Sequence, residues 1–261
     1  FMRKGGSGMV SVIFPAAGQG KRMHAGFNKV FLEIIGESIL LRTLRRFSEV
    51  PAVQELVVVT GTDEVAAVRR RLSHVPGLKP LKVVAGGSER QYSVWNGLRQ
   101  ADPQADIVLV HDAARPLVTP KTIEAVIAAA QEHGAAVAAV PAKNTVKIVK
   151  DGIVTETPDR STLWSVQTPQ GFHRDILVAA NEKAEQEGFL GTDDASLVEH
   201  YGMPVHVVMD SYRNIKITTP EDLIIAEAFL RHENGGVRGS LRKVAKRAGA
   251  HLSGHCQGKD G

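Results

Sequence analysis

The sequence predicts an α/β protein with a mostly parallel sheet and helices on both of its faces. Three observations support this fold class: short apolar runs recur along the chain, amphipathic segments separate them, and glycine-rich stretches follow several of them. Strands that alternate with helices favour a parallel sheet, because each helix returns the chain to the same edge. Such a sheet opens its ligand crevice at the carboxyl ends of its strands.

The expected strands are short, and most are apolar throughout. An unbroken apolar run of this length is typical of a strand that is buried on both faces. The strands are expected over 10–14, 56–59, 81–85, 107–110, 135–140, 161–168, 205–209 and 215–217.

The helices between the strands carry start and stop signals. Ser38 can cap a helix whose apolar residues share one face, and Gly134 ends a helix that Thr119 begins. Ser88 and Gln91 have the spacing of a capping box at the start of another helix. The remaining helices are expected over 63–74, 174–187 and 192–200 and from Pro220 onward.

An insertion at about 142–172 breaks the alternation. Two strand-like runs, 145–149 and 153–157, flank an Asp151-Gly152 turn and predict a β-hairpin. A single hairpin buries too little surface to be stable alone. We therefore expect this arm to pack on a second subunit, so that the protein is a homodimer.

Composition limits the classes of protein that remain. The 261 residues, 43% of them hydrophobic, suffice for one large domain, expected over 9–234, with residues 1–8 as an added leader. The apolar runs are too short for a membrane span, and the single cysteine, Cys256, suits the reducing cytoplasm. Basic residues concentrate in the leader and in 235–261, expected to be a disordered tail, so no specific nucleic-acid partner is predicted.

The loop after the first strand suits a triphosphate. Small residues and glycines allow close backbone approach, and cations follow them: Ala16, Ala17, Gly18, Gly20, Lys21, Arg22 and Lys29. Two named motifs do not fit: Met23 replaces the third small residue of the dinucleotide fingerprint, and Arg22 replaces the hydroxyl residue of a P-loop. A glycine-rich turn with solvated cations is the plain structural alternative.

Two charged residues are expected at other strand ends. Asp112 follows an apolar strand, where a carboxylate needs solvent, a cation or a metal; one or two carboxylates together with substrate phosphates suit Mg²⁺. A structural ion pair with Arg115 is the alternative. Lys216 lies between two isoleucines and is either a phosphate ligand at the sheet mouth or a solvated lysine on an edge strand.

Six motifs together resemble those of the 2-C-methyl-D-erythritol 4-phosphate cytidylyltransferase family of the nonmevalonate isoprenoid pathway. The similarity covers about residues 10–230, and ribitol-5-phosphate cytidylyltransferases share most of it. The motifs are Pro15-Ala16-Ala17-Gly18 with Gly20-Lys21-Arg22-Met23, Gly86-Gly87-Ser88-Glu89-Arg90 with Ser93-Val94, His111-Asp112-Ala113-Ala114-Arg115-Pro116, Thr168-Pro169-Gln170, Thr192-Asp193-Asp194, and Asn214-Ile215-Lys216 with Thr218 and Pro220-Glu221-Asp222.

The resemblance implies a Rossmann-like nucleotidyltransferase sheet of the glycosyltransferase-A type with a protruding β-hairpin arm. It also implies a Mg²⁺-dependent transfer of CMP from CTP to a polyol phosphate, with release of pyrophosphate. A different sugar-phosphate nucleotidyltransferase or a nucleotide-binding protein without turnover remains the alternative. A protein that only binds a nucleotide has no need of Arg22, Lys29, Asp112 and Lys216 at separate strand ends.

The resemblance further implies a role for each site residue. Arg22, Lys29, Arg160 and Lys216 would be catalytic, and Asp112 would hold Mg²⁺, with Asp210 or Asn214 as a further ligand. The nucleotide would contact Ala16, Ala17, Gly18, Gly20, Gly87, Ser93, Asp112 and Ala113. The acceptor would contact Thr145, Arg160, Thr168 and Lys216, with Thr145 and Arg160 reaching it from the neighbouring subunit. The family usually has Pro before the loop lysine and Gln after it, where this chain has Asn28 and Val30.

Overall fold

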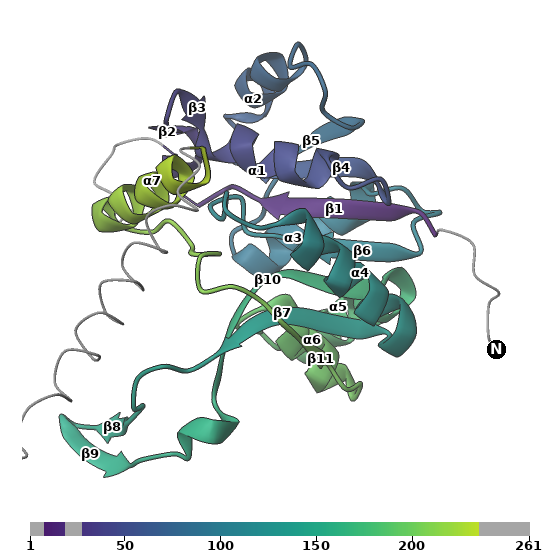
Figure 1. Cartoon of the computed structure of the whole chain (residues 1–261). Helices are drawn as coiled ribbons and strands as arrows, with labels where there is room; N and C mark the ends of the chain where they lie inside the picture. Colours follow the sequence, from purple (N-terminus) through teal and green to yellow (C-terminus); the bar gives the residue numbers. More distant parts are fainter. Residues whose placement is uncertain (1–7, 19–27, 235–261) are drawn as a thin grey trace, which may run out of the picture.

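The computed structural model describes residues 8–18 and 28–234, which form one mixed sheet with helices on both faces (Figure 1). The strands lie in the order β11-β7-β10-β6-β1-β4-β5, and only β10 runs antiparallel to its neighbours. Their bounds are β1 (Val10–Pro15), β4 (Val53–Thr60), β5 (Leu81–Ala85), β6 (Ile107–Val110), β7 (Ala135–Pro141), β10 (Trp164–His173) and β11 (His206–Met209). The prediction of a mostly parallel α/β sheet is confirmed.

Strand β1 lies near the centre of the sheet and contributes to two cores. Val12 and Phe14 face the helices on one side, and Ile13 faces those on the other, as the alternation of side chains along a strand requires. One core packs against α1 (Ile39–Ser48), α2 (Val65–Leu72) and α4 (Pro120–His133). The other packs against α3 (Arg90–Gln100), α5 (Arg174–Glu187) and α6 (Asp194–Tyr201).

Two of the predicted helix signals are confirmed by the cap geometry. The Ser38 hydroxyl accepts a hydrogen bond from the Leu41 backbone at the start of α1. Thr119 caps α4 in the same way, and Gly134 ends that helix with φ +89°, a conformation that glycine adopts without strain.

Three local features differ from expectation. The predicted capping box at Ser88 does not form: Glu89 is the N-cap of α3, and its side chain makes no capping hydrogen bond. The predicted strand over 215–217 does not form either: this segment pairs with no strand of the described chain, and Ile217 is instead buried against α7 (Pro220–Asn234). A short hairpin of β2 (Glu33–Ile34) and β3 (Glu37–Ser38) was not predicted.

The arm projects away from the main sheet (Figure 1). Its strands β8 (Ile148–Lys150) and β9 (Ile153–Glu156) pair with each other, and the first part of β10 returns the chain to the sheet. Asp151 and Gly152 both have positive φ, as a two-residue hairpin turn of this kind requires. Ile153 is 69% exposed, and four other apolar residues of the hairpin are also exposed: Val146, Ile148, Val149 and Val154.

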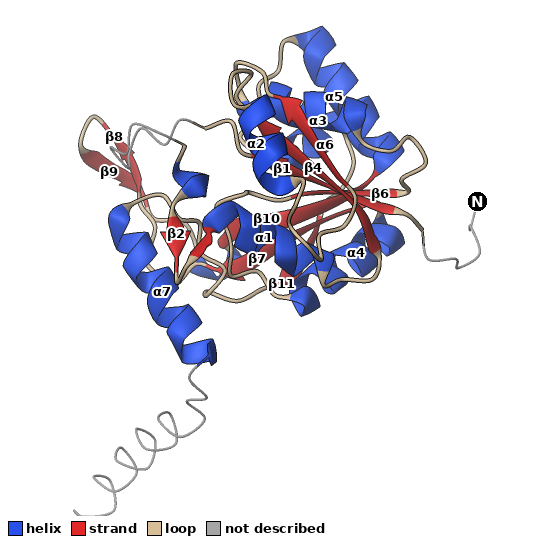
Figure 2. Ribbon diagram, turned by 90° about the horizontal axis from the view of Figure 1, so that it is seen from above, coloured by secondary structure: helices blue, strands red, loops and turns tan. Residues whose placement is uncertain are grey.

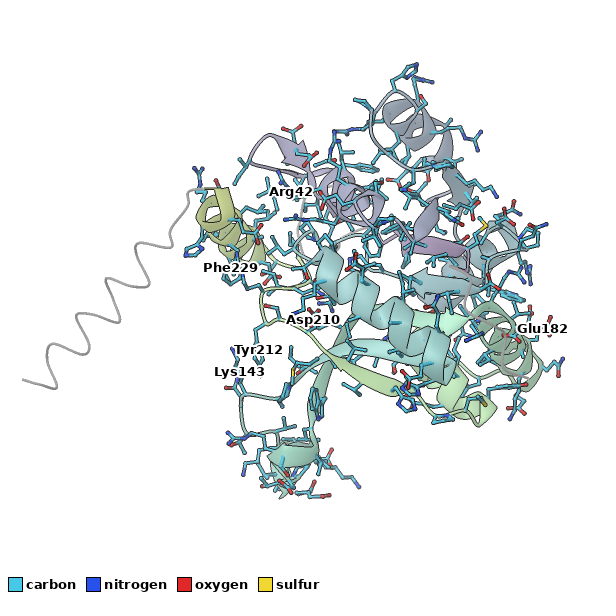
Figure 3. All side chains as sticks on the ribbon, turned by 45° about the vertical axis from the view of Figure 1, so that its right-hand side comes forward. Arg42, Lys143, Glu182, Asp210, Tyr212 and Phe229 are labelled. Atoms are coloured by element: carbon cyan, nitrogen blue, oxygen red, sulfur yellow. The ribbon has the colours of Figure 1, made fainter. Side chains whose placement is uncertain are left out.

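Two sets of contacts hold the base of the arm and helix α7 in place. At the base of the arm, the Lys143 ammonium lies 3.5 Å from the centroid of the Tyr212 ring (Figure 3). Helix α7 lies beside β2 (Figure 2) and packs against the small core that includes Ile217. None of the helices in the described residues is both long and apolar enough to span a bilayer.

Candidate functional site

A cavity of about 450 Å³ opens at the carboxyl ends of β1, β5 and β6. This is the edge at which a parallel sheet is expected to bind its ligand. Nine of the predicted site residues line the cavity: Ala16, Ala17, Gly18, Lys29, Gly87, Ser93, Asp112, Ala113 and Lys216. Residues from four motifs far apart in the sequence therefore meet at one site.

One wall of the cavity is built by the turn after β5. The Gly87 backbone donates to the Ser93 hydroxyl, and that hydroxyl donates to the Glu89 carbonyl, so the turn is tied to the first turn of α3. A Cβ atom on Gly87 would lie 2.5 Å from that of Tyr92, which is too close. Glycine is therefore required here for the backbone to approach the helix, and the exposed backbone groups are suited to a nucleotide.

Lys29 enters the cavity wall from a short 3₁₀ turn, Lys29–Phe31, that Asn28 caps. The buried Asn28 amide donates one hydrogen bond to the Ala16 carbonyl and one, at 3.2 Å, to Glu64 Oε2. Its own oxygen accepts from the Val30 backbone. The residue before Lys29 thus ties this turn to the end of β1 and to the residue that precedes α2.

Asp112 is the acidic centre of the cavity, and three cations surround it. Its Oδ2 lies 3.0 Å from Lys216 Nζ and 3.3 Å from Arg115 Nε, and its Oδ1 lies 3.7 Å from Arg90 Nε. Burial alone would raise the pKa of Asp112, but the three cations together hold it well below its ordinary value. The carboxylate is ionised, and the cavity carries an excess of positive charge around it.

The ion pair between Asp112 and Arg115, which was the structural alternative for Asp112, is present, and Asp112 nevertheless lines the cavity. Arg115 also donates to the Asn214 carbonyl, so it joins the strand end after β6 to the segment that carries Lys216. Lys216 itself is half exposed and faces the cavity, as the sheet-mouth hypothesis required, although the segment that presents it is not a strand.

Arg90 is a cavity residue that the sequence motifs alone did not predict as part of the site. It lines the cavity at the start of α3 and donates to Asp194 Oδ2 at 2.8 Å. Its position directly after the Gly86–Glu89 turn was the available signal, since that turn is the second glycine-lined strand end. Its pairing with Asp194 could not be predicted, because the two residues are far apart in the sequence and no local pattern indicates the contact.

Thr168 does not line the cavity, and its role in holding the acceptor stays a prediction. The residue is buried, and its hydroxyl accepts from the Asp112 backbone at 3.1 Å and donates to His111 Nδ1 at 3.0 Å. His111 Nε2 in turn donates to the Arg115 carbonyl. Burial lowers the pKa of His111 to about 3, so the imidazole is neutral. Through the Thr168 hydroxyl, this ring helps to hold the Asp112 backbone in position.

Other predicted residues lie elsewhere. Gly20 and Arg22 lie outside the described residues. Thr145 and Arg160 are exposed in the arm and do not line the cavity; Arg160 donates to the Lys143 carbonyl at 3.2 Å. Asp210 and Asn214 hydrogen-bond each other and do not line the cavity either, and a role as further metal ligands stays a prediction for them.

The donor set fits Mg²⁺ only if substrate oxygens complete its shell. The described residues contain no group of three His, Cys, Asp or Glu side chains that could hold a metal by itself. Mg²⁺ is usually bound through one or two carboxylates together with phosphates and water. Asp112 supplies one ionised carboxylate with its Oδ1 beyond hydrogen-bond distance of Arg90, which suits that mode.

Comparison with known proteins agrees with this site. The family model described as 2-C-methyl-D-erythritol 4-phosphate cytidylyltransferase matches residues 10–232. Enzymes of that name from Symbiobacterium thermophilum and Geobacter metallireducens are 52% and 48% identical, each over 86% of this chain and over 94% and 98% of their own lengths.

Solved structures show the same relationship. The 4-diphosphocytidyl-2C-methyl-D-erythritol synthase of Anaerococcus prevotii superposes with a TM-score of 0.77 and 34% identity, covering 87% of this chain and 100% of that one. The 2-C-methyl-D-erythritol 4-phosphate cytidylyltransferase of Thermus thermophilus gives 0.70 and 34%, covering 85% and 99%. Sequence, fold and cavity agree that this chain belongs to the 2-C-methyl-D-erythritol 4-phosphate cytidylyltransferase family.

Proposed function

We propose that this chain transfers CMP from CTP to 2-C-methyl-D-erythritol 4-phosphate, an early step of isoprenoid precursor synthesis, and releases pyrophosphate. Family membership over residues 10–232 supports the reaction. The single structural observation that carries it is the convergence of Lys29, Asp112 and Lys216 on one glycine-walled cavity. A cytoplasmic location stays a prediction from the sequence.

In this reaction an oxygen of the acceptor phosphate attacks the α-phosphorus of CTP. The bond from the α-phosphorus to the bridging oxygen of the β-phosphate breaks, and that oxygen leaves with pyrophosphate. Catalysis then depends on alignment of the two phosphates and on compensation of negative charge as it moves to the leaving group. In this proposal Lys216 binds the reacting phosphates, and Lys29, together with Arg22, stabilises the leaving group.

Asp112 is the proposed Mg²⁺ ligand, together with phosphate oxygens of CTP. The ion would neutralise phosphate charge and hold the triphosphate in one geometry. Arg115 and Lys216 fix the other oxygen of Asp112 by ion pairing, so the carboxylate has a defined orientation before any ligand enters.

The cytosine and ribose would lie against the wall formed by Ala16, Ala17, Gly18, Gly87 and Ser93. Several of these residues offer backbone groups, and a backbone carbonyl distinguishes the 4-amino group of cytosine from the 4-oxo group of uracil. We infer selection of CTP over UTP by hydrogen-bond donor and acceptor pattern rather than by charge.

The arm completes the acceptor site of a neighbouring subunit in this proposal. Thr145 and Arg160 are exposed and do not line the cavity at the carboxyl ends of β1, β5 and β6, while the arm displays apolar residues that a partner would cover. An isologous two-fold dimer would place each arm at the other subunit's cavity.

Release of pyrophosphate from CTP tests the reaction. The purified protein is offered CTP with 2-C-methyl-D-erythritol 4-phosphate, with ribitol 5-phosphate or with neither, at fixed Mg²⁺. We expect release that depends on the methylerythritol acceptor and falls strongly when UTP replaces CTP. Faster release with ribitol 5-phosphate would identify that compound as the acceptor. No release with either acceptor would refute the proposed cytidylyltransferase activity.

A further inference from the structure

Arg90 lies between two carboxylates and is hydrogen-bonded to only one of them. Its Nη2 donates to Asp194 Oδ2 at 2.8 Å, whereas its Nε lies 3.7 Å from Asp112 Oδ1. The second distance exceeds the range of an N–H···O hydrogen bond. The guanidinium is therefore held by Asp194 and only approaches Asp112.

The two oxygens of Asp112 have different surroundings. Oδ2 contacts both Lys216 and Arg115, so it is already committed to ion pairs. Oδ1 is the oxygen that Arg90 approaches, at 3.7 Å from Nε. The position of Arg90 therefore affects how readily Oδ1 can bind a further ligand.

Asp194 is held rigidly at the start of α6. Asp193 and Ser196 form a capping box around it, and Gln170 on β10 both donates to Asp193 and accepts from the Ala195 backbone. The Asp194 side chain is 1% exposed. Arg90 thus pairs with a buried carboxylate whose neighbours on both sides in the sequence are anchored by hydrogen bonds.

The Arg90–Asp194 pair is a poor device for stability alone. Burial raises the pKa of Asp194 despite its pairing with Arg90, and its Oδ1 has no hydrogen-bond partner within the described chain. A buried ion pair with an unpaired oxygen is often less stabilising than apolar residues of the same size. Its position beside the cavity suggests that it acts on the site.

We infer that Asp194 is a positioning residue that draws Arg90 away from Asp112 and keeps Oδ1 of Asp112 open to a divalent cation. A shift of about 1 Å would bring the guanidinium into direct hydrogen bonding with Asp112. The cation would then have to displace a charge-assisted bond before it could bind. The inference rests on the proposed function, in which Asp112 is the metal ligand.

The test measures metal binding without turnover. Mn²⁺ serves as the probe and is titrated into the protein with CTP and no acceptor, and free Mn²⁺ is followed by electron paramagnetic resonance. In Asp194→Asn the charge that holds Arg90 is lost, and we expect Mn²⁺ affinity to fall about tenfold or more, as for loss to a competing charged hydrogen bond. The double variant Arg90→Gln/Asp194→Asn should recover affinity to within about threefold of wild type, because no guanidinium remains to cover Oδ1.

Two further variants separate positioning from damage to the fold. Glu55→Gln removes another buried carboxylate with a cationic partner, Lys82, at the opposite end of β4, and should leave Mn²⁺ affinity unchanged. Arg90→Lys should fold even if Asp194→Asn does not, and should bind Mn²⁺ as tightly as wild type or more tightly, because a single ammonium cannot span both carboxylates.

The outcomes distinguish this inference from the proposed function. Unchanged affinity in Asp194→Asn, an equally weak double variant, or weaker binding in Arg90→Lys would each overturn the positioning role while wild type still binds Mn²⁺. If wild type with CTP binds no more Mn²⁺ than CTP alone, the metal role of Asp112 fails and the inference fails with it. Pyrophosphate release by wild type then shows independently whether the transferase assignment stands.

Discussion

The ammonium of Lys216 lies 3.0 Å from Oδ2 of Asp112, which joins the segment before α7 to the end of β6. This contact places a cation beside the proposed metal ligand and keeps it at the cavity wall. Because the Lys216 side chain is 40% exposed, its loss should not open a cavity in the core.

Lys216→Gln is expected to fold and to lose turnover. Removal of one group that stabilises developing charge typically lowers kcat by about 10² to 10³. The control is Lys82→Gln, because Lys82 is similarly exposed and ion-paired to Glu55 far from the cavity. Steady-state kinetics and melting temperatures of both variants check this; equal kcat values would show that Lys216 serves only the ion pair.

Much of the site could be predicted because parallel strands bring their carboxyl ends together. Gly18, Gly87 and Asp112 each follow an apolar run, and the sheet order places those runs near one another. That these three residues lie close together could be predicted from the order of strands and helices, and not from any single motif.

The parts that could not be predicted depend on contacts between distant residues. Gln91 has the spacing of a capping residue but bonds the Phe189 carbonyl and the Gly191 amide instead. Ile217 has the alternation of a strand, but no strand of the described chain pairs with it, and its side chain packs against α7. A local sequence pattern predicts the partner of such a residue correctly only where no residue distant in the sequence competes for it.

The Asn28 amide is expected to position Lys29. In Asn28→Asp both donors are lost and a carboxylate faces the Ala16 carbonyl and the Glu64 carboxylate, so kcat should fall by about tenfold or more through loss of hydrogen bonds to buried acceptors. Asn28 has φ −66°, the value that proline adopts, so Asn28→Pro should preserve the turn and lose less activity.

The comparison of the two Asn28 variants is made by kcat and KM for CTP together with melting temperature. A proline variant as impaired as the aspartate variant would show that the side-chain bonds, and not the backbone angle alone, hold the turn. Full activity in Asn28→Asp would remove Asn28 from any role in positioning Lys29.

Asp112→Asn should raise the Mg²⁺ concentration needed for half-maximal activity. The neutral amide keeps the shape of the carboxylate but is a weaker ligand for a hard cation. Chelation by EDTA should abolish activity in wild type, and excess Mg²⁺ should restore it. Turnover that survives EDTA would argue against any metal at Asp112.

Asp222 is expected to stabilise α7 in a pH-dependent manner. Its Oδ2 accepts from the Thr218 hydroxyl and from the Thr218 and Thr219 backbones. Burial alone would raise the pKa of Asp222, but these hydrogen bonds lower it below its ordinary value. Because the folded-state pKa is the lower one, the stabilisation is complete above the unfolded pKa and is lost as pH falls through the folded pKa.

Asp222→Ala should therefore lower the free energy of unfolding by about 1 kcal/mol at neutral pH, as for loss of a helix cap. The difference between wild type and variant should shrink below about pH 4, where the unfolded carboxyl begins to bind protons. Urea denaturation at several pH values checks this; a difference that stays constant into acid would mean that the hydroxyl and amide donors do not need the charge.

The last prediction concerns the arm, whose apolar residues are exposed and whose Arg160 does not line the cavity of its own chain. Two inactive variants, Lys29→Ala and Arg160→Ala, are unfolded together and refolded. If Arg160 acts on the neighbouring subunit, each mixed dimer has one site that lacks both residues and one site with both intact. Random pairing makes about half of the dimers mixed, so roughly a quarter of wild-type activity should return.

If Arg160 acts within its own chain, every site in the mixture lacks one of the two residues and no activity returns. Each variant refolded alone is the control, and sedimentation confirms that dimers have formed. The two models thus differ in a quantity that does not depend on how much either residue contributes to catalysis. A mixture that is dimeric but inactive would confine Arg160 to its own subunit and leave the cytidylyltransferase assignment to the pyrophosphate assay.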